Sequence, residues 1–378
     1  MKIVSIEPTP SPNTMKLHLD ESLAPGVRRT YTADNYRSAP PFIQRMLDIE
    51  GVKSVFHTLD FVALDRRASA DWAAILAVVK EAFGDEGAPL SIPGAEDGES
   101  GGFGEAQVFV QTFRNIPMQI RVKAEGKEER VALSERFTKA VTAVASATLI
   151  KERRLAEYGV RYGELAEIAK EVEQEIEAAY PEERLEALVR QAIALGASEE
   201  PFVEARRELS DEEVAAKLDD PDWRVRYAAL EAMQPTLERL PLIEKALRDS
   251  QSQIRRLAVV YLGDLRAPEA MPPLFAALKD SSAAVRRTAG DTLSDLGDPA
   301  AIGPMIAALR DASKLVRWRA ARFLYEAGDE TALDALREAA ADPEFEVGLQ
   351  ARMALERIEE GVAAAGSVWQ QMARRNDE

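Results

Sequence analysis

The sequence predicts an α+β domain at the N-terminus, followed by a predominantly α-helical solenoid. Within residues 1–83, short alternating apolar runs are separated by turn-forming residues, a pattern typical of strands. Between residues 210 and 360 one pattern recurs about every 31 residues, and a repeat of that length indicates stacked helix pairs. The repeats are marked by five aspartates: Asp220, Asp249, Asp280, Asp311 and Asp342.

Residues 1–83 are expected to form one compact domain. Two strands are predicted at 2–6 and 15–19, joined by a turn rich in proline. Pro40 and Pro41 suit the first turn of a helix, which Gly51 would end. A hairpin at 52–64 and an amphipathic helix at 71–83 complete the predicted domain.

The next two segments differ in composition. Residues 84–105 hold seven glycines and six acidic residues without Lys or Arg, which predicts a flexible linker. Residues 106–209 begin with a predicted hairpin, formed by the alternating runs 106–113 and 118–122. From about Glu128 the apolar spacing becomes helical, and further helices are predicted at 155–158, 162–179 and 184–195.

Residues 210–360 are expected to form five repeats of two helices each, and residues 361–378 form a tail. Apolar residues follow each aspartate at the fifth, ninth and thirteenth positions, and the ninth is always alanine. Because these positions are four residues apart, they share one helix face and should form the core seam.

An arginine stands six residues after the aspartate in four repeats, whereas the fifth repeat has Gly348. A guanidinium can bind a carboxylate through two hydrogen bonds, so we predict a structural ladder in which each arginine bridges the aspartate of its own or the next repeat. The alternative is a basic stripe that touches an acidic partner or phosphate. The predicted ladder comprises Asp220, Asp249, Asp280, Asp311, Arg226, Arg255, Arg286 and Arg317.

Neighbouring positions on the second helices are the candidates for partner binding, because they point further round the helix. Exposed aromatic residues beside arginine are typical anchors of protein interfaces. Packing over the neighbouring repeat is the other interpretation of these aromatic residues. The predicted partner-binding residues are Arg256, Arg287, Trp318, Arg319 and Tyr227.

Composition excludes several classes of function. The chain has no cysteine, which rules out disulfides, thiolate catalysis and clusters held by cysteine. No nucleotide-binding, zinc-protease or serine-hydrolase motif occurs, so we predict no catalytic residue, no metal, no cofactor and no enzymatic activity. The net charge of −17 argues against nucleic-acid binding, which depends on neutralising phosphates. No apolar run reaches the roughly 18 residues of a membrane span, and a cytoplasmic location is expected.

Three resemblances refine these predictions. The repeat pattern D-x-x-x-x-V-R-x-x-A-x-x-x-L resembles HEAT-like repeats, which occur in many binding proteins. The segments EPTPSPNTMK, from Glu7, and IEGVKSVF, from Ile49, resemble the N-terminal domain of Nfu-type iron–sulfur scaffold proteins. In Nfu proteins a different domain holds the cluster through two cysteines, and neither that domain nor any cysteine is found here.

The turn that carries the Nfu resemblance has two interpretations. Its prolines fix a rigid connection between strands. The other interpretation is a recognition loop for an iron–sulfur assembly partner. The residues concerned are Thr9, Pro10, Ser11, Pro12 and Asn13.

With FRNIPMQI from Phe113 and GSVWQQM from Gly366, the whole chain resembles the conserved virulence factor C family. The resemblance implies a regulatory or assembly scaffold that is linked to virulence. We therefore expect a non-enzymatic cytoplasmic scaffold or adaptor that binds partner proteins through its repeats. The alternative is an accessory or metal-handling factor in iron–sulfur cluster assembly, acting through the first domain.

Overall fold

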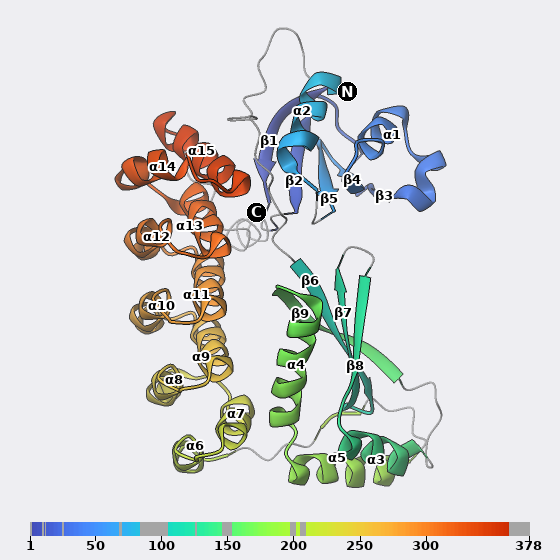
Figure 1. Cartoon of the computed structure of the whole chain (residues 1–378), viewed down its shortest axis with the longest axis vertical. Helices are drawn as coiled ribbons and strands as arrows, with labels where there is room; N and C mark the ends of the chain where they lie inside the picture. The colour runs from blue at the N-terminus through green and yellow to red at the C-terminus, as the bar shows by residue number, and fades with distance from the viewer. Residues whose placement is uncertain are drawn as a thin grey trace. The chain divides into compact units, whose positions relative to one another are not determined.

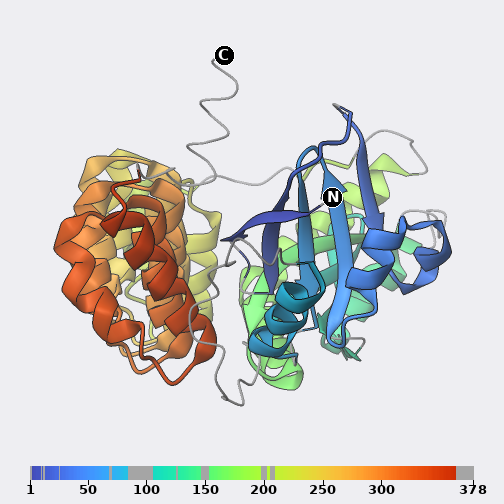
Figure 2. The same cartoon turned by 90° about the horizontal axis from the view of Figure 1, so that it is seen from above.

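The computed structural model describes residues 2–9, 11, 13–24, 26–67, 70–83, 105–124, 127–145, 153–196, 202–204 and 209–362. Figure 1 labels the helices and strands, and Figure 2 shows the chain after a 90° turn. The chain divides into two compact units, which are described separately: Met1–Phe103 with Ala289–Glu378, and Gly104–Thr288. The linker predicted at 84–105, except Glu105, and nearly all of the predicted tail lie outside the described residues.

The first unit opens with a five-stranded antiparallel sheet in the order β1-β2-β5-β4-β3. Burial alternates along β2, so that every second side chain enters the core. The helices add Ile43, Met46 and Trp72 to that core. The elements are β1 (Ile3–Pro8), β2 (Thr14–Leu19), β3 (Arg28–Tyr31), α1 (Pro41–Leu47), β4 (Val52–Thr58), β5 (Phe61–Arg66) and α2 (Trp72–Phe83).

The second unit opens with a four-stranded antiparallel sheet in the order β8-β7-β6-β9. Arg114 and Asn115 adopt positive φ angles of 48° and 61° and make the tight turn of the predicted hairpin. The elements are β6 (Glu105–Phe113), β7 (Ile116–Ala124), β8 (Lys127–Ala132), α3 (Glu135–Ala145), β9 (Arg153–Tyr162), α4 (Leu165–Ala179) and α5 (Glu182–Leu195).

Two helix predictions in this region are wrong. The segment after Glu128 continues as strand β8 up to Ala132, because it pairs with β7, and the helix begins only at Glu135. The predicted helix at 155–158 is part of β9, which pairs with β6 along nearly its whole length. In both places pairing with a neighbouring strand outweighs a short helical spacing.

The chain continues with five helix pairs, as predicted, and an α+β region followed by helical repeats is confirmed as the fold class. The alanines of the seam are buried in every repeat, whereas Val225 in the first repeat and Leu355 in the last are only half-buried. The pairs are α6 (Asp211–Lys217) and α7 (Trp223–Ala232), α8 (Leu240–Ala246) and α9 (Ser252–Leu265), α10 (Met271–Ala277) and α11 (Ala283–Leu296), α12 (Ile302–Ala308) and α13 (Lys314–Ala327), and α14 (Leu333–Ala339) and α15 (Phe345–Glu359).

Candidate functional site

Three arginines of the predicted ladder, Arg226, Arg255 and Arg317, each bind the aspartate of the next repeat. Arg226 donates two hydrogen bonds to the Asp249 carboxylate, at 2.6 and 2.9 Å. Arg255 binds Asp280 in the same way, at 2.7 and 2.8 Å, and Arg317 binds Asp342 at 2.7 and 3.0 Å. Each of these arginines also donates to the main-chain oxygen of its own repeat's aspartate. Arg286 donates to the main-chain oxygen of Asp280, at 2.8 Å.

The ladder aspartates also organise the turns between helices. The Asp249 carboxylate accepts the amide of Gln251 at 2.8 Å, and Asp280 accepts that of Ser282 at 2.7 Å. Burial alone would raise the pKa of both carboxyls, but the arginine and amide donors outweigh it and hold each pKa below its ordinary value. These groups therefore fix the spacing of the repeats.

Replacing Arg255 with lysine should lower the free energy of unfolding by about 1–3 kcal/mol. Lysine keeps the charge but cannot span the Asp280 carboxylate and the Asp249 main-chain oxygen together. Denaturant unfolding measures the change. Lys245→Arg is the matched control, since Lys245 binds the exposed Asp219 at 2.7 Å and should tolerate the change. Equal effects of the two substitutions would contradict the structural role of the ladder.

Arg256, predicted to bind a partner, instead lies inside the second unit against the chain's own helix α4. Its guanidinium donates to Glu175 at 2.6 Å, and that carboxylate is almost completely buried. Arg161 reaches the other oxygen of Glu175 at 3.3 Å, and the Tyr158 hydroxyl lies 3.1 Å from the same oxygen. We call Glu175, Arg161, Arg256 and Tyr158 the buried charge cluster.

The charges of this cluster depend on one another. Burial would raise the pKa of Glu175, but Arg256 and Arg161 outweigh it and hold that pKa below 4.5. Burial and the charge of Arg256 lower the pKa of Arg161. Burial and the Glu175 carboxylate raise the pKa of Tyr158, so this hydroxyl stays protonated at neutral pH. The cluster is a stable ion network, and none of its groups titrates near pH 7.

The other predicted partner-binding residues are also engaged within their own units. The Arg287 guanidinium stacks 4.4 Å from the ring centroid of Tyr162, and Arg319 binds Asp291 at 2.6 Å. Tyr227 and Trp318 are each only 4% exposed, so the expectation that they are surface aromatics is wrong. Burial removes these large apolar rings from water, which favours the packed interpretation of both residues.

A groove of about 1010 Å³ lies in the second unit and is lined by residues of α4, α5, α6 and α7. Six alanines contribute to its lining: Ala178, Ala179, Ala187, Ala228, Ala229 and Ala232. Six acidic and four basic residues complete much of the lining. Two of the basic residues are already paired, Arg136 with Glu177 at 2.8 Å and Arg184 with Glu204 at 2.8 Å. We call this feature the α4–α7 groove.

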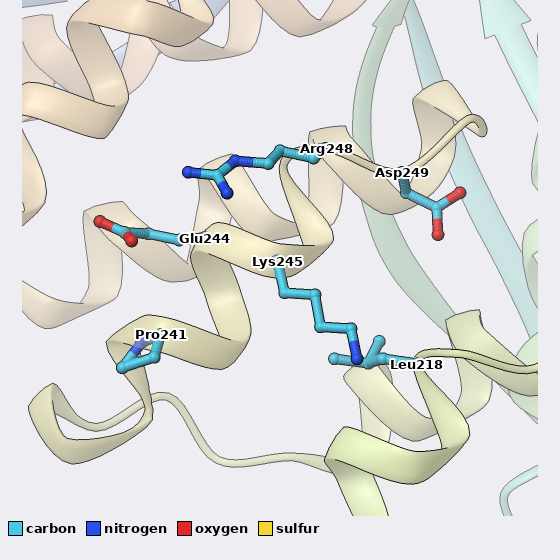
Figure 3. A pocket seen from close by; sticks show the side chains of 6 residues that line it. All are labelled: Leu218, Pro241, Glu244, Lys245, Arg248 and Asp249. Atoms are coloured by element: carbon cyan, nitrogen blue, oxygen red, sulfur yellow. The ribbon is translucent and has the colours of Figure 1, made fainter.

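A smaller pocket of about 350 Å³ lies on α8 of the second unit (Figure 3). Two of its charged lining residues are already engaged within the repeats, because Lys245 binds Asp219 and Asp249 belongs to the ladder. Pro241 and Leu218 supply the apolar part of its lining, and the pocket is smaller than the α4–α7 groove.

The candidate recognition loop is connected to the last repeat through Arg66. The Thr9 hydroxyl donates to the main-chain oxygen of Thr14 at 2.9 Å, and the Arg66 Nε donates to the Asn13 side chain at 3.2 Å. Arg66 also forms a fully buried ion pair with Glu346 of α15, at 2.7 Å. Within the loop Ser11 is also described, whereas Pro10 and Pro12 lie outside the described residues.

Helix α15 completes the core of the first domain. Phe345 and Leu349 belong to the same buried cluster as Trp72, and Met353 packs against it. Gly348 replaces the ladder arginine here, and a Cβ atom at Gly348 would lie 3.2 Å from the main-chain oxygen of Ala340. That oxygen accepts a hydrogen bond from Arg352 at 2.6 Å. The missing arginine in the fifth repeat was the only sequence signal that this helix differs.

Among the described residues, no helix combines the length and apolar character that a bilayer span requires. The same residues contain no group of three or more His, Cys, Asp or Glu side chains placed to hold a metal ion. His57 is only 2% exposed, and burial, followed by the charge of Arg29, lowers its pKa below 6.5.

Comparison with known families agrees with the geometry of both units. Residues 4–88 match the family described as scaffold protein Nfu/NifU N terminal, and residues 111–189 match the family described as virulence factor. Residues 239–310 and 302–378 match HEAT repeats. The fold and the ladder thus define a HEAT-repeat protein with an Nfu-type N-terminal domain.

The chain belongs to the conserved virulence factor C family. It is 46% identical to conserved virulence factor C of Staphylococcus aureus, over 99% of this chain and all of that protein. The Bacillus subtilis protein YpgR is 55% identical, over 98% of each chain. A crystal structure of S. aureus protein SAV1430 covers 22% of this chain and 99% of that one, with 44% identity and a TM-score of 0.21.

Proposed function

We propose that this protein is a non-catalytic scaffold that binds a partner protein in the α4–α7 groove. The occupant that fits is an amphipathic helix whose polar face is basic. The supporting observation is a groove of about 1010 Å³ that is lined by alanines and has more acidic than basic residues. Alanine side chains leave room for the larger apolar side chains of an incoming helix.

The charge of the groove lining determines which polar face an incoming helix needs. Arg136 pairs with Glu177 and Arg184 with Glu204, and all four residues belong to the lining, so the acidic excess of the groove is carried by the other carboxylates. The Glu182 side chain is 66% exposed, and Glu183 is exposed beside it on the first turn of α5. Lys and Arg on an incoming helix would meet these carboxylates at the rim of the groove, where charge governs specificity and association rate.

Selection from a displayed library of helical peptides tests this function. We expect binders with an apolar stripe and a basic polar face, and we expect Ala228→Trp to weaken the selected peptides by about tenfold or more, because the indole fills the groove. Ala284→Trp is the matched control, since Ala284 is exposed on α11 outside the groove. Acidic binders, or basic binders that tolerate Ala228→Trp, would contradict the proposal.

The relatives named conserved virulence factor C support a further part of the proposal, a link to virulence expression. We propose that the protein binds its partner in the cytoplasm. HEAT repeats as a class offer extended surfaces to other proteins, which favours a scaffold over an enzyme.

The Nfu-type domain supports a second candidate function, an accessory role in iron–sulfur cluster assembly. This role would use residues 4–88 to contact an assembly protein, with the cluster held elsewhere. Anaerobic titration of the full chain with Fe(II) separates this role from direct metal handling. Saturable Fe(II) binding that His57→Gln removes would favour metal handling. If no Fe(II) binds, direct metal handling is excluded and the accessory role through contact with an assembly protein remains.

A further inference from the structure

Strand β9 lies at one edge of the second unit's sheet, and among the described strands it pairs with β6 alone. Its first five residues, from Arg153 to Glu157, are all exposed, and Tyr158 is 37% exposed although its hydroxyl reaches Glu175. Leu155 is 45% exposed and stands between these charged residues. Unpaired main-chain donors and acceptors along such an edge are a template for another strand.

The charges on this edge are also uncommitted. Among the described residues, Arg153, Arg154 and Glu157 have no ion-pair partner. The opposite edge of the same sheet differs, because on β8 Glu128 pairs with Arg130 at 2.9 Å. On β9, charges of both signs flank an apolar residue, and opposite charges placed across two strands stabilise their pairing.

The order of residues on β9 is complementary to itself in an antiparallel pair. Because side chains alternate along a strand, Arg153, Leu155 and Glu157 share one face. When two copies pair about a two-fold axis through Leu155, Leu155 lies opposite Leu155 and each Arg153 lies opposite Glu157. The registers centred on Arg154 and on Glu157 instead place like charges opposite each other.

We propose that two copies of this chain associate through β9 in the register centred on Leu155. The two four-stranded sheets then form one continuous antiparallel sheet. Main-chain hydrogen bonds along the edge hold the pair together, and two Arg153–Glu157 pairs around the leucines fix its register. This association does not depend on the α4–α7 groove. A single strand pair is smaller than most stable interfaces, so the dimer should be weak and concentration-dependent.

Sedimentation velocity of the full chain over a dilution series tests the inference. Arg153→Glu alone, and Glu157→Arg alone, should each weaken self-association by about tenfold or more, because each places like charges opposite each other twice in the dimer. An equimolar mixture of the two variants should restore dimers, since positions 153 and 157 are then both acidic on one edge and both basic on the other. The same-chain exchange Arg153→Glu/Glu157→Arg should restore them too.

Arg154→Glu is the matched control, because Arg154 points to the other face and would lie opposite Ala156. It should leave the association constant nearly unchanged. A wild-type chain that stays monomeric at every concentration would overturn the inference. So would dimers that survive Arg153→Glu, or a mixture of the two single variants that fails to associate. Unchanged thermal unfolding of each variant shows that the fold is intact.

Discussion

Glu346→Ala is expected to lower the free energy of unfolding by about 3–5 kcal/mol, because it leaves the Arg66 guanidinium buried without its carboxylate. Both side chains of this pair are almost completely buried, at 0% and 2% exposure. Arg66 would retain the main-chain oxygen of Ala70, at 2.8 Å, and the Asn13 side chain. Those acceptors do not neutralise its charge, so the contact between the first domain and α15 should open first.

Denaturant unfolding followed by tryptophan fluorescence measures this change, because Trp72 lies in the same core. Glu344→Ala is the matched control on the same end of α15, where Glu344 pairs with Lys314 at 3.2 Å and is 30% exposed. That change should cost less than about 1 kcal/mol. The double replacement Arg66→Met/Glu346→Leu should recover most of the loss. Equal costs for Glu344→Ala and Glu346→Ala would contradict the buried pair.

In the second unit, Glu175→Gln is expected to lower the free energy of unfolding by a similar amount, about 3–5 kcal/mol. The amide keeps the shape of the side chain but leaves Arg161 and Arg256 facing each other without a neutralising charge. Glu167→Gln on the exposed side of α4 is the control and should change stability little. If the two variants unfold at the same denaturant concentration, the buried charge cluster does not stabilise the second unit.

The same carboxylate gives a pH dependence of known sign. The folded pKa of Glu175 lies below its ordinary value of 4.5, so its contribution is complete above pH 4.5 and is lost as the pH falls through the folded pKa. The stability difference between the wild type and Glu175→Gln should therefore be constant from pH 5 to 8. It should shrink below pH 4.5. A difference that grows on acidification would contradict this assignment.

The repeats could be predicted because their information is local. An alanine nine residues after each aspartate fixes the helix seam, and Arg255 binds the aspartate of the next repeat, Asp280. Strand β3 and the strand character of β9 were missed, since their partners β4 and β6 are distant in sequence. Pairing of that kind leaves little periodic trace in a short segment.

The buried charge cluster could not be predicted for a similar reason. Arg256 and Glu175 are 81 residues apart, and nothing in the sequence marks Glu175 among the neighbouring glutamates of α4. The helical periodicity predicted correctly that Arg256 is not a ladder residue. It does not show whether solvent, a partner or the chain itself covers the helix face on which Arg256 lies. The Arg66–Glu346 pair was missed in the same way, because it joins two segments far apart in the chain.

Thermal unfolding of Arg256→Glu tests most directly whether Arg256 stabilises the fold or is a free residue of a partner-binding surface. With its own carboxylate next to Glu175 in a buried site, the variant should melt many degrees below the wild type. An unchanged melting temperature would contradict this role. Arg256 would then be a surface residue and again a candidate for partner binding.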